Sequence, residues 1–293
     1  MKLSGFTFVR NAIKYGYPVE ASIRSLLPLV DEMIVCVGQS EDDTEALIRS
    51  INSEKIRIVN TVWDENLKQG GAVLAEETNK AMDATAADSD WLFYIQADEV
   101  LHEQDHDTIR QAMLRYLEDK KVEGLLFNYL HFYGSYRYIG DGRKWYSKEI
   151  RVIRNDKQIR SYLDAQGFRW KDGRKLNVKL IDANIHHYGW VRNPLKMFQK
   201  LKEVGKLWGG NDDQGKETGL KTAERYDYSN IDSVTAFKGT HPAVMESLVK
   251  QEDWDADLEI SRKKFKNSKH RLLYFLWKTF GWRPFEYSNY KRI

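Results

Sequence analysis

The stretch DWLFYIQADEVL, residues 90–101, decides how the fold is read, because an apolar run at residues 91–95 leads into two adjacent carboxylates, Asp98 and Glu99. A short apolar run bounded by polar residues is typical of a buried strand. In open α/β sheets, ligands bind beyond the carboxyl ends of the strands. We therefore expect the chemistry of this protein where this strand ends.

The segments before this stretch alternate between two patterns. Apolar runs typical of strands lie at residues 3–9, 32–37, 55–60 and 91–95, and segments with apolar residues at helical spacing lie between them, at 18–30, 42–51 and 70–85. This order predicts parallel, doubly wound strands joined by right-handed crossovers. Residues 124–139 and 147–154 are rich in aromatic and β-branched side chains, which predicts further, partly antiparallel strands. The expected fold class is α/β, a mixed sheet flanked by helices.

The length and composition of the chain exclude several classes of protein. The chain has 293 residues, 42% of them hydrophobic, and no apolar run approaches the length of roughly 20 residues that crosses a bilayer. The start of the chain does not have the pattern of a secretory leader, so we expect a cytoplasmic protein. Cys36 is the single cysteine, which excludes an internal disulfide and a zinc site built from several thiolates. It lies in an apolar run and is interpreted as a small buried hydrophobe.

The chain divides into an α/β part at residues 1–190 and a helical, basic extension at 191–293. A polar, glycine-rich stretch at about 209–232 predicts a mobile loop. The formal net charge is +3, but residues 261–293 carry ten Lys and Arg against one acid, Glu286, which gives the tail +9 and leaves −6 for the rest. The charge pattern is thus a basic tail on a mildly acidic body.

The tail at 261–293 mixes these cations with Leu, Phe and Trp, a composition expected at an anionic membrane surface. We expect a peripheral association with the inner face of the cytoplasmic membrane. The alternative is a helix that packs its apolar side chains on its own domain and keeps its lysines in solvent. Nucleic acid is not an expected partner, because no recognised motif is present and the positive charge is confined to one end.

The carboxylates themselves have two interpretations. Asp98 and Glu99 are either turn or helix-capping residues, or ligands of a hard cation. Mg²⁺ and Mn²⁺ sites typically combine one or two carboxylates with substrate phosphates and water. The spacing of these two residues does not separate the two cases.

Four segments in order carry a resemblance to a known family: VRNAI at 9–13, PLVDEMIVCVGQSEDDT at 28–44, TNKAM at 78–82 and DWLFYIQADEV at 90–100. Together they resemble family 2 glycosyltransferases of the GT-A fold, over about the first 100 residues. Two positions depart from the family pattern. Val37 stands where the family has an acid that contacts the nucleotide base, and Gln96 stands where the first acid of its DxD motif is expected. Val37 removes an acceptor for an N–H of the base, whereas Gln96 still offers both a donor and an acceptor.

The resemblance implies roles for individual residues. It implies a divalent cation, Mn²⁺ or Mg²⁺, held by Asp98 with Glu99 or a histidine, for which we expect His187. It implies a nucleotide site that includes Arg10, Asn11, Val37, Gln39, Asn79 and Gln96. Two further residues are expected at the phosphates from their chemistry: Lys68 as a cation, and Gly70, which lets backbone amides approach phosphate at the start of a helix. Lys200 is a further candidate cation near the phosphates. The structural alternative for Gly70 and its neighbour is a loop before a helix.

The resemblance also implies a general base after the strand that follows the metal motif. There the segment IRSYLDAQGFRW, residues 159–170, makes Asp164 the first candidate, and Asp172 is the second. Asp164 is equally compatible with a turn. In the segment NIHHYGW at 184–190, adjacent histidines of an extended chain point to opposite faces, so only one of them can face the site. The aromatic residues Trp145, Tyr146, Tyr188 and Trp190 either stack on sugar rings or pack in the core.

These features predict a metal-dependent, inverting glycosyltransferase. Its donor would be a nucleotide-diphosphate sugar and its acceptor a saccharide or glycolipid, in surface glycan assembly of the lipopolysaccharide or capsule type. Two alternatives stay open: a nucleotidyltransferase, which lacks support from a glycine- and arginine-rich phosphate loop after the first strand, and a GT-A-like protein that binds a sugar or nucleotide without turnover. Kinase, dehydrogenase and hydrolase motifs are absent from the sequence.

Overall fold

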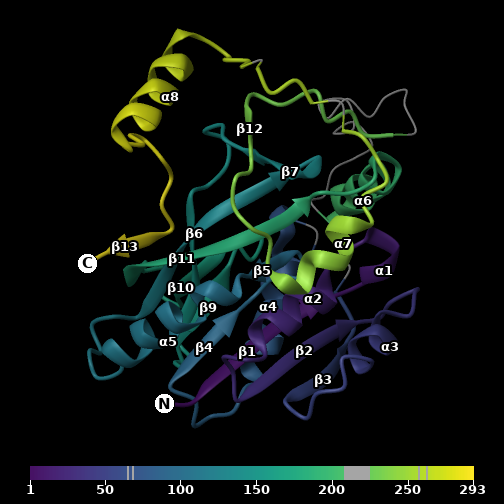
Figure 1. Cartoon of the computed structure of the whole chain (residues 1–293). Coiled ribbons are helices and arrows are strands. Elements are labelled where there is room, and N and C mark those ends of the chain that lie inside the picture. The colour runs from purple at the N-terminus through teal and green to yellow at the C-terminus, as the bar shows by residue number, and fades with distance from the viewer. Residues whose placement is uncertain (65, 68, 208–224, 257, 262) are drawn as a thin grey trace.

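The computed structural model describes residues 1–64, 66–67, 69–207, 225–256, 258–261 and 263–293, and it contains one large mixed sheet flanked by helices (Figure 1). The main path of the sheet runs through β12 (Val234–Ala236), β7 (Ser135–Gly140), β6 (Gly124–Tyr133), β8 (Lys148–Arg154), β4 (Trp91–Tyr94), β1 (Leu3–Val9), β2 (Glu32–Gly38) and β3 (Ile56–Thr61). β11 (Leu176–Trp190) branches from this path and pairs with β6, β5 (Glu99–Leu101) and β13 (Tyr290–Arg292). The expected fold class is confirmed.

The first 100 residues form the parallel part of the sheet. β1 pairs in parallel with β2 and β4, and β2 pairs in parallel with β3. The connecting helices are α1 (Ala12–Tyr15), α2 (Val19–Leu26), α3 (Thr44–Arg49) and α4 (Ala72–Asp83), and α5 (His106–Arg115) follows β5. β8 is antiparallel to both β4 and β6, as the second pattern of strands predicts.

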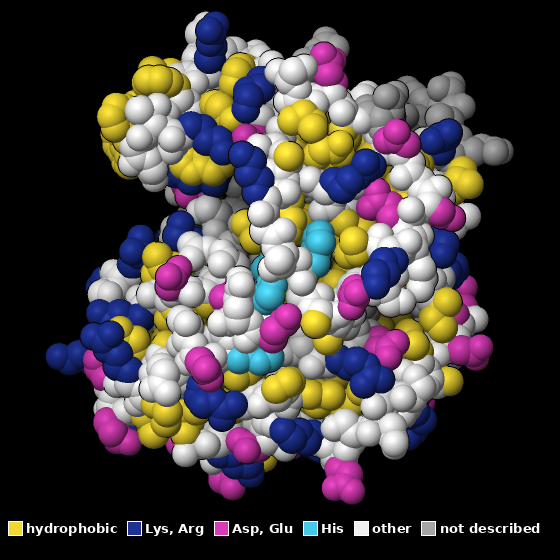
Figure 2. Space-filling model, viewed as in Figure 1, with side chains coloured by type: hydrophobic (Ala, Val, Ile, Leu, Met, Phe, Trp, Pro, Cys, Tyr) yellow, Lys and Arg dark blue, Asp and Glu magenta, His cyan; other side chains and the backbone are white. Residues whose placement is uncertain are grey.

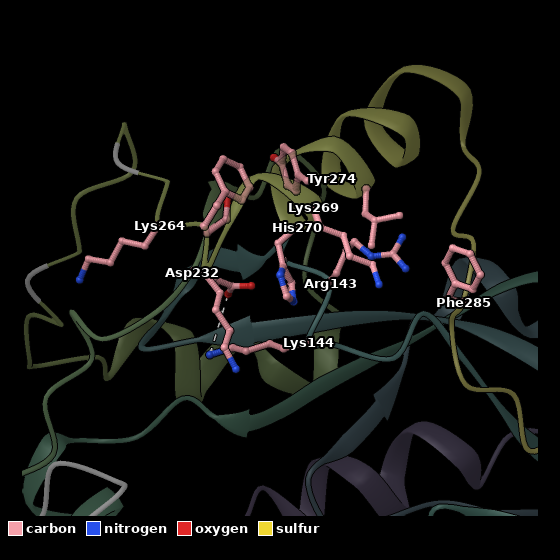
Figure 3. A pocket seen from close by; sticks show the side chains of 13 residues that line it. Arg143, Lys144, Asp232, Lys264, Lys269, His270, Tyr274 and Phe285 are labelled. Atoms are coloured by element: carbon pink, nitrogen blue, oxygen red, sulfur yellow. Dashed lines mark ion pairs between the residues drawn. The ribbon is translucent and has the colours of Figure 1, made fainter.

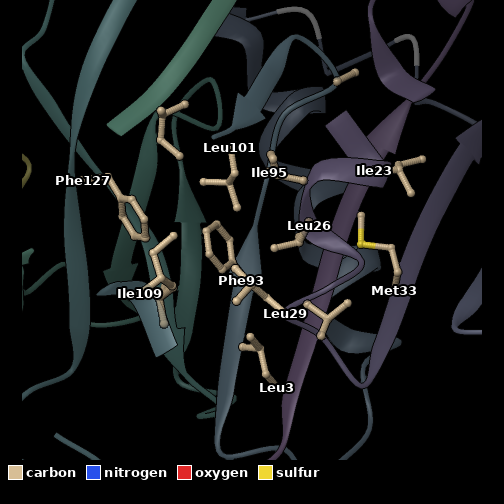
Figure 4. Packing of buried hydrophobic residues seen from close by; sticks show 14 of the residues in the cluster. Leu3, Ile23, Leu26, Leu29, Met33, Phe93, Ile95, Leu101, Ile109 and Phe127 are labelled. Carbon is tan, nitrogen blue, oxygen red and sulfur yellow. The ribbon is translucent and has the colours of Figure 1, made fainter. Parts of the chain in front are cut away.

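Both faces of the central strands are buried, which explains their almost continuous apolar sequences. Along β2, alternate side chains enter two different cores: Met33, Val35 and Val37 enter one, and Ile34 and Cys36 enter the other. Helix α2 covers the first core with Ile23 and Leu26 (Figure 4), and α4 covers the second with Ala81 and Met82. Burial raises the pKa of Cys36 to about 12, so this thiol is a packing residue as expected.

The C-terminal extension differs from the expectation of a helical addition, because it returns to the sheet twice. It contains α6 (Pro194–Leu207), α7 (Glu246–Lys250) and α8 (Ser268–Phe280), but β12 pairs with β7 and β13 pairs with β11. Helix α8 buries none of its residues and stands away from the sheet at the upper left of Figure 1. Among the described residues, no helix is long and apolar enough to cross a membrane.

A separate hairpin lies beside the main sheet. It consists of β9 (Ile159–Tyr162) and β10 (Gly167–Trp170), which pair with each other, and Arg169 of β10 also forms an isolated bridge with Lys175. Short 3-10 turns occupy Gln69–Gly71, Glu103–Asp105 and Ala243–Met245. Most of the loop predicted at 209–232 lies outside the described residues, which resume at residue 225.

Candidate active site

The site is organised around Asp98, in the turn between β4 and β5 at the carboxyl end of β4. The carbonyl of Asp98 accepts a 2.8 Å hydrogen bond from the backbone N–H of Tyr188, which fixes the turn against β11. This register places His187 over Asp98, with 3.8 Å between His187 Nε2 and Asp98 Oδ1. Two residues predicted as metal ligands are therefore brought together by pairing between distant segments.

A chain of hydrogen bonds determines which nitrogen of His187 faces Asp98. His131 lies opposite His187 in the pairing of β6 with β11, and its Nε2 is 2.8 Å from the carbonyl oxygen of Tyr146. A carbonyl only accepts, so His131 Nε2 carries a hydrogen, and burial lowers the pKa of His131 and keeps the ring neutral. His131 Nδ1 must then accept from His187 Nδ1, at 3.0 Å.

Burial also lowers the pKa of His187, so this ring is neutral as well, and its Nε2 is left with a lone pair. A lone pair and a carboxylate oxygen that face each other at 3.8 Å are both acceptors, and they attract a cation between them. His131 acts on His187 as outer-shell partners act on metal-bound histidines, because it fixes both the tautomer and the orientation of the ring.

Gly189 keeps the space between these two groups open. A Cβ atom at this position would lie 2.5 Å from His187 Nε2 and 2.9 Å from Asp98 Oδ2. Residues 187 and 189 of an extended strand point to the same face, so any larger side chain at 189 would fill this space. The residues present fit a divalent cation that completes its ligands with phosphate and water oxygens. Among the described residues, no group of three or more His, Cys, Asp and Glu side chains surrounds one metal position.

Two cations flank the Asp98 carboxylate. Lys200 Nζ on α6 lies 3.6 Å from Asp98 Oδ2 and donates a 3.0 Å hydrogen bond to the carbonyl of Gly189. Arg192 is buried and donates to the carbonyls of Tyr15 and Gly189, whereas its Nη2 has no partner among the described residues. An unpaired buried guanidinium N–H is costly, so it indicates an anionic ligand.

These charges set the protonation of the site. Burial alone would raise the pKa of Asp98, but the His187 ring when it is protonated, together with the cations Lys200 and Arg192, outweighs burial and holds this pKa below its ordinary value. Burial and then Arg192 lower the pKa of Lys200 to about 7, against the opposing effect of Asp98. The site therefore contains an ionised carboxylate and a lysine that gains a full charge when an anion binds.

Glu99 has a different role from the one expected. Its carboxylate is fully buried and forms a bidentate pair with Arg151, at 2.7 and 2.8 Å. Tyr129 Oη donates to the same carboxylate at 2.7 Å, and the backbone N–H of Gln96 donates at 3.1 Å. With its oxygens occupied in this way, Glu99 is a structural residue, and the expectation that it binds metal is corrected.

The turn between β9 and β10 brings Asp164 toward the same edge of the sheet. The carbonyl of Ala165 accepts a 3.2 Å hydrogen bond from Gln96 Nε2, and the carbonyl of Gln166 accepts from Arg151. Asp164 Oδ1 is buried without a hydrogen-bond partner, and burial raises the pKa of this carboxyl. Leu163 and Ala165, on either side, have positive φ angles of 53° and 64°. Asp164 Oδ2 accepts a 3.3 Å hydrogen bond from Gln166 Nε2, so Oδ1 is the oxygen of this carboxylate that lacks a partner among the described residues. A strained turn that holds such an oxygen is a candidate functional feature, and Asp164 stays a prediction as the base.

Asp172 lies at the opposite end of β10, beyond Trp170. It is exposed, and its Oδ1 accepts a 2.9 Å hydrogen bond from the backbone N–H of Arg174, which is the geometry of a turn residue. The expectation of Asp172 as second candidate base is corrected, because a strand of four residues separates it from the turn that contains Asp164.

The expected nucleotide end of the site lies beyond β1 and β2. Arg10 Nε and Trp63 Nε1 are buried donors without a partner among the described residues, and the guanidinium lies 5.6 Å from the indole ring. The indole covers Gly38, where a Cβ would lie 2.4 Å from Trp63 Nε1. Val37 is buried in the core beneath it, and Gln39 is exposed. Trp63 and Arg192 had no motif to single them out in the sequence.

The remaining predicted nucleotide contacts are placed as follows. Asn11 adopts the left-handed conformation with φ 55° and accepts from the backbone N–H of Glu41, so it holds a turn. Asn79 accepts from the backbone N–H of Ser161 and joins α4 to β9. Gly70 has φ 61° and open space around it, directly before α4. Lys68 lies outside the described residues.

The two adjacent histidines do point to opposite faces. His186 packs against Phe132 in a buried cluster, and burial lowers its pKa to about 3. Tyr188 is buried in the same cluster. Trp145 stacks on His131 with 5.1 Å between the ring centroids, so it forms a wall next to the metal pair. The partly exposed Trp145, Tyr146 and Trp190 therefore stay candidates for contacts to a sugar, whereas Tyr188 is a core residue.

No family model and no curated protein matches the chain. Among solved structures, it is similar to glucosyl-3-phosphoglycerate synthase from Mycobacterium tuberculosis in complex with Mn²⁺, uridine diphosphate and phosphoglyceric acid, at 20% identity over 44% of this chain and 43% of that one, with a TM-score of 0.30. It is also similar to S. aureus TarS, at 13% identity over 70% of this chain and 39% of that one, with a TM-score of 0.39. The TarS 1–349 structure has 13% identity over 75% and 69% of the two chains, with a TM-score of 0.38.

The chain spans less than half the length of the first two of these proteins. At such identities and TM-scores, a likeness does not carry over an activity. We therefore infer the function of this chain from its own residues.

Proposed function

We propose that the chain is a metal-dependent glycosyltransferase, which moves a sugar from a nucleotide-diphosphate donor to a saccharide or glycolipid acceptor with inversion. One observation carries this proposal. The Asp98 carboxylate and the lone pair of His187 Nε2 face each other at 3.8 Å across the space above Gly189, and two cations adjoin them. A cation held between one carboxylate and one imidazole, with basic side chains alongside, suits a diphosphate that must leave.

Asp98 and His187 would hold the divalent cation, Mn²⁺ or Mg²⁺. When bound, such a cation supplies Lewis-acid stabilisation of the leaving diphosphate. Arg192 Nη2 and Lys200 Nζ donate to phosphate oxygens and share the charge that develops there. Lys200 takes up a proton as the anion enters, because its pKa of about 7 rises next to a phosphate.

In the transfer step, the acceptor hydroxyl oxygen attacks the anomeric carbon of the donor sugar. The bond from that carbon to the diphosphate oxygen breaks, and the nucleoside diphosphate leaves with the bonding electron pair. The hydroxyl proton passes to the Asp164 carboxylate, whose raised pKa makes it a better proton acceptor than an exposed aspartate. Attack opposite the leaving group inverts the configuration of the sugar.

The base of the nucleotide would lie at the ends of β1 and β2. Val37 provides no acceptor there, whereas Arg10 Nε and Trp63 Nε1 are unpaired donors. We therefore expect the base to be read through its carbonyl and ring-nitrogen acceptors.

Residues 1–190 would form the catalytic domain, and residues 191–293 would face the acceptor and the membrane. Support for a membrane surface comes from α8 and the residues after it, where Leu272, Phe275, Phe280 and Trp282 each expose more than half of their surface. The same segment carries six of the ten Lys and Arg residues of the tail. Exposed apolar and cationic side chains together suit an anionic membrane. We propose peripheral binding at the inner face of the cytoplasmic membrane, in surface glycan assembly.

The test combines ligand binding with transfer. Thermal unfolding is followed with UDP, GDP, CDP and dTDP and their sugar conjugates, each with and without Mn²⁺, for the natural chain and for Asp98→Asn. We expect one nucleotide to raise the unfolding temperature only with Mn²⁺, and Asp98→Asn to lose that shift. If no nucleotide gives a metal-dependent shift, the proposal is wrong.

A second pair of variants separates a transferase from a protein that only binds the donor. Asp164→Asn should keep the nucleotide shift and lose sugar transfer or slow donor hydrolysis, whereas Asp172→Asn, the matched control on the same hairpin, should keep both. Binding without transfer or hydrolysis in the natural chain would indicate a non-catalytic binder instead.

A further inference from the structure

A second cavity lies between α8 and the body of the protein, with a volume of about 550 Å³. Figure 3 shows its walls, with Arg143 and Lys144 on the body and Lys269, His270 and Tyr274 on α8. Figure 2 shows α8 standing off from the body, with Lys and Arg side chains gathered on the side of the helix that faces it. We name this cavity the α8 pocket.

The α8 pocket has a large excess of positive charge. The Lys and Arg residues that line it are Arg143, Lys144, Lys264, Lys266 and Lys269, and the single acid is Asp232. Within the described part of the chain, one of these cations forms an ion pair: Lys144 lies 3.9 Å from Asp232. The nearby Asp141 is occupied by Lys263 and Lys278. The pocket therefore has positive charge that the described residues do not neutralise, and this charge attracts an anionic ligand.

Two further features of the wall indicate a ligand, although Lys269 Nζ lies 5.8 Å from the centroid of the Phe285 ring. Arg143 Nη1 is buried and has no hydrogen-bond partner among the described residues, although Nη2 donates to the carbonyl of Pro284. Phe285 is 89% exposed and has a φ of 62°, a conformation that a phenylalanine rarely adopts. An unpaired donor next to an exposed, strained aromatic ring indicates a ligand with both an anionic group and a flat face.

The α8 pocket is connected to the active site through one aromatic ring. Lys144 Nζ, on the pocket wall, lies 5.2 Å from the ring centroid of Trp145. Other neighbours of the Trp145 ring are Tyr133, Trp190 and His131, and His131 stacks on it and holds His187 in its tautomer. Lys144 on the pocket wall and His131 beside the metal pair therefore contact the same ring.

We propose that the α8 pocket binds the acceptor, and that this acceptor carries a phosphoryl or diphosphoryl group next to a sugar. Arg143, Lys144 and Lys269 bind the phosphate oxygens, and Phe285 stacks on the adjoining ring. This inference rests on the proposed transferase function and adds the chemical class of the acceptor to it.

The test is direct binding, measured by calorimetry without metal, with pyrophosphate and with glucose 1-phosphate as probes. The background is Arg192→Gln/Lys200→Gln, so that the two cations assigned to the donor phosphates do not take part. The double variant Lys144→Gln/Lys269→Gln should weaken both probes by about tenfold or more, because each lost charged hydrogen bond removes a substantial part of the binding free energy. The matched control is Lys157→Gln. Lys157 is 48% exposed and lies 3.8 Å from Asp83, and Lys144 is 47% exposed and lies 3.9 Å from Asp232.

Phe285→Ser separates the two parts of the ligand. It should weaken glucose 1-phosphate several-fold and leave pyrophosphate unchanged, since pyrophosphate has no ring to stack on. Equal binding of both probes by the natural chain, the double variant and Lys157→Gln would overturn the proposal. A loss of binding in Lys157→Gln as large as in the double variant would also overturn it, because the loss would then come from the lower net charge of the protein and not from the α8 pocket.

A second experiment distinguishes a lipid-linked acceptor from a free sugar phosphate. Binding to phosphatidylcholine vesicles is compared with and without a polyprenyl diphosphate saccharide, and the double variant is included. Vesicle binding that depends on both the diphosphate and the two lysines assigns a lipid-linked acceptor; binding of the soluble probe alone assigns a free sugar phosphate. Either result is independent of nucleotide binding, so failure of the transferase proposal would be visible separately, in the metal-dependent nucleotide shift.

Discussion

The reassignment of Glu99 from metal ligand to structural residue gives the most informative prediction. Glu99 and Arg151 are both fully buried, and their bidentate pair is supplemented by Tyr129 Oη and the backbone N–H of Gln96. Arg151 also donates to the carbonyls of Ile150 and Gln166. Every polar group of the pair is therefore satisfied within the protein.

Glu99→Gln keeps the shape of the side chain but removes the charge that balances Arg151. Breaking a buried pair by removing one partner typically costs about 3–5 kcal/mol, because the other charge stays buried without compensation. We expect a loss of this size from the free energy of unfolding for Glu99→Gln, and a similar loss for Arg151→Met. In the double variant no buried charge is left uncompensated, so its loss should be clearly smaller than the sum.

The assay is urea unfolding of the four proteins at neutral pH, with Mn²⁺-dependent nucleotide binding measured in parallel under native conditions. The m-value should not change, since the same surface is exposed on unfolding. Glu99→Gln should keep metal-dependent binding as long as it is folded. A Glu99→Gln protein of natural stability that has lost metal-dependent binding would refute this reasoning and return Glu99 to the metal site.

Three further predictions concern the site and its surroundings. Gly189→Ala should abolish Mn²⁺-dependent nucleotide binding with little change in far-UV circular dichroism, because the added Cβ would lie 2.5 Å from His187 Nε2; retained binding would contradict the proposed cation position. At a pH above 7, Lys200 is mostly neutral, so the binding of a nucleoside diphosphate should take up a proton. This uptake should appear as a binding enthalpy that depends on the buffer, and Lys200→Met should remove the dependence. An equal dependence in Lys200→Met would show that another group takes up the proton. Burial raises the pKa of Glu149 from its ordinary value of 4.5 to about 8, so between these values the folded state binds a proton that the unfolded state lacks. Stability should therefore fall as pH rises through this window, and Glu149→Gln should flatten that slope in urea unfolding; an unchanged slope would refute the assignment.

The sequence predicts the parallel half of the fold well, because each of its strands and helices carries a local signal. The apolar run at residues 91–95 corresponds to β4, and the carboxylates after it lie at the expected edge of the sheet. The sequence does not reveal that β12 and β13 return to the sheet. Each has three residues, too few for a recognisable pattern, and their partners are far away in the chain.

In the site, too, the sequence predicts residues that lie in a local motif but not residues whose role depends on contacts between distant segments. Asp98 and His187 were both predicted, but Asp98 and Glu99 were treated as one pair, although adjacent residues near a strand point to different sides. The same argument was applied to His186 and His187, where it agrees with the structure. His131 could not be found from the sequence, because its role depends on the pairing of β6 with β11. Asp172 has the residue type and the position in sequence expected of the base, but it lies beyond β10, at the end opposite the turn that contains Asp164.

The path of β11 explains why His187, Arg192 and Lys200 of the site lie close together in the sequence. His187 and Gly189 are two residues apart in the strand and therefore lie on the same face. His187 supplies the imidazole, and Gly189 has no side chain, which leaves space beside it. Arg192 follows at the end of the strand, and α6 then carries Lys200 back over the carbonyl of Gly189. Within fourteen residues, this segment therefore provides a metal ligand, an open space and two cations. Asp98 is the acid that balances them, which explains why a carboxylate is required at the end of β4 even before any ligand binds.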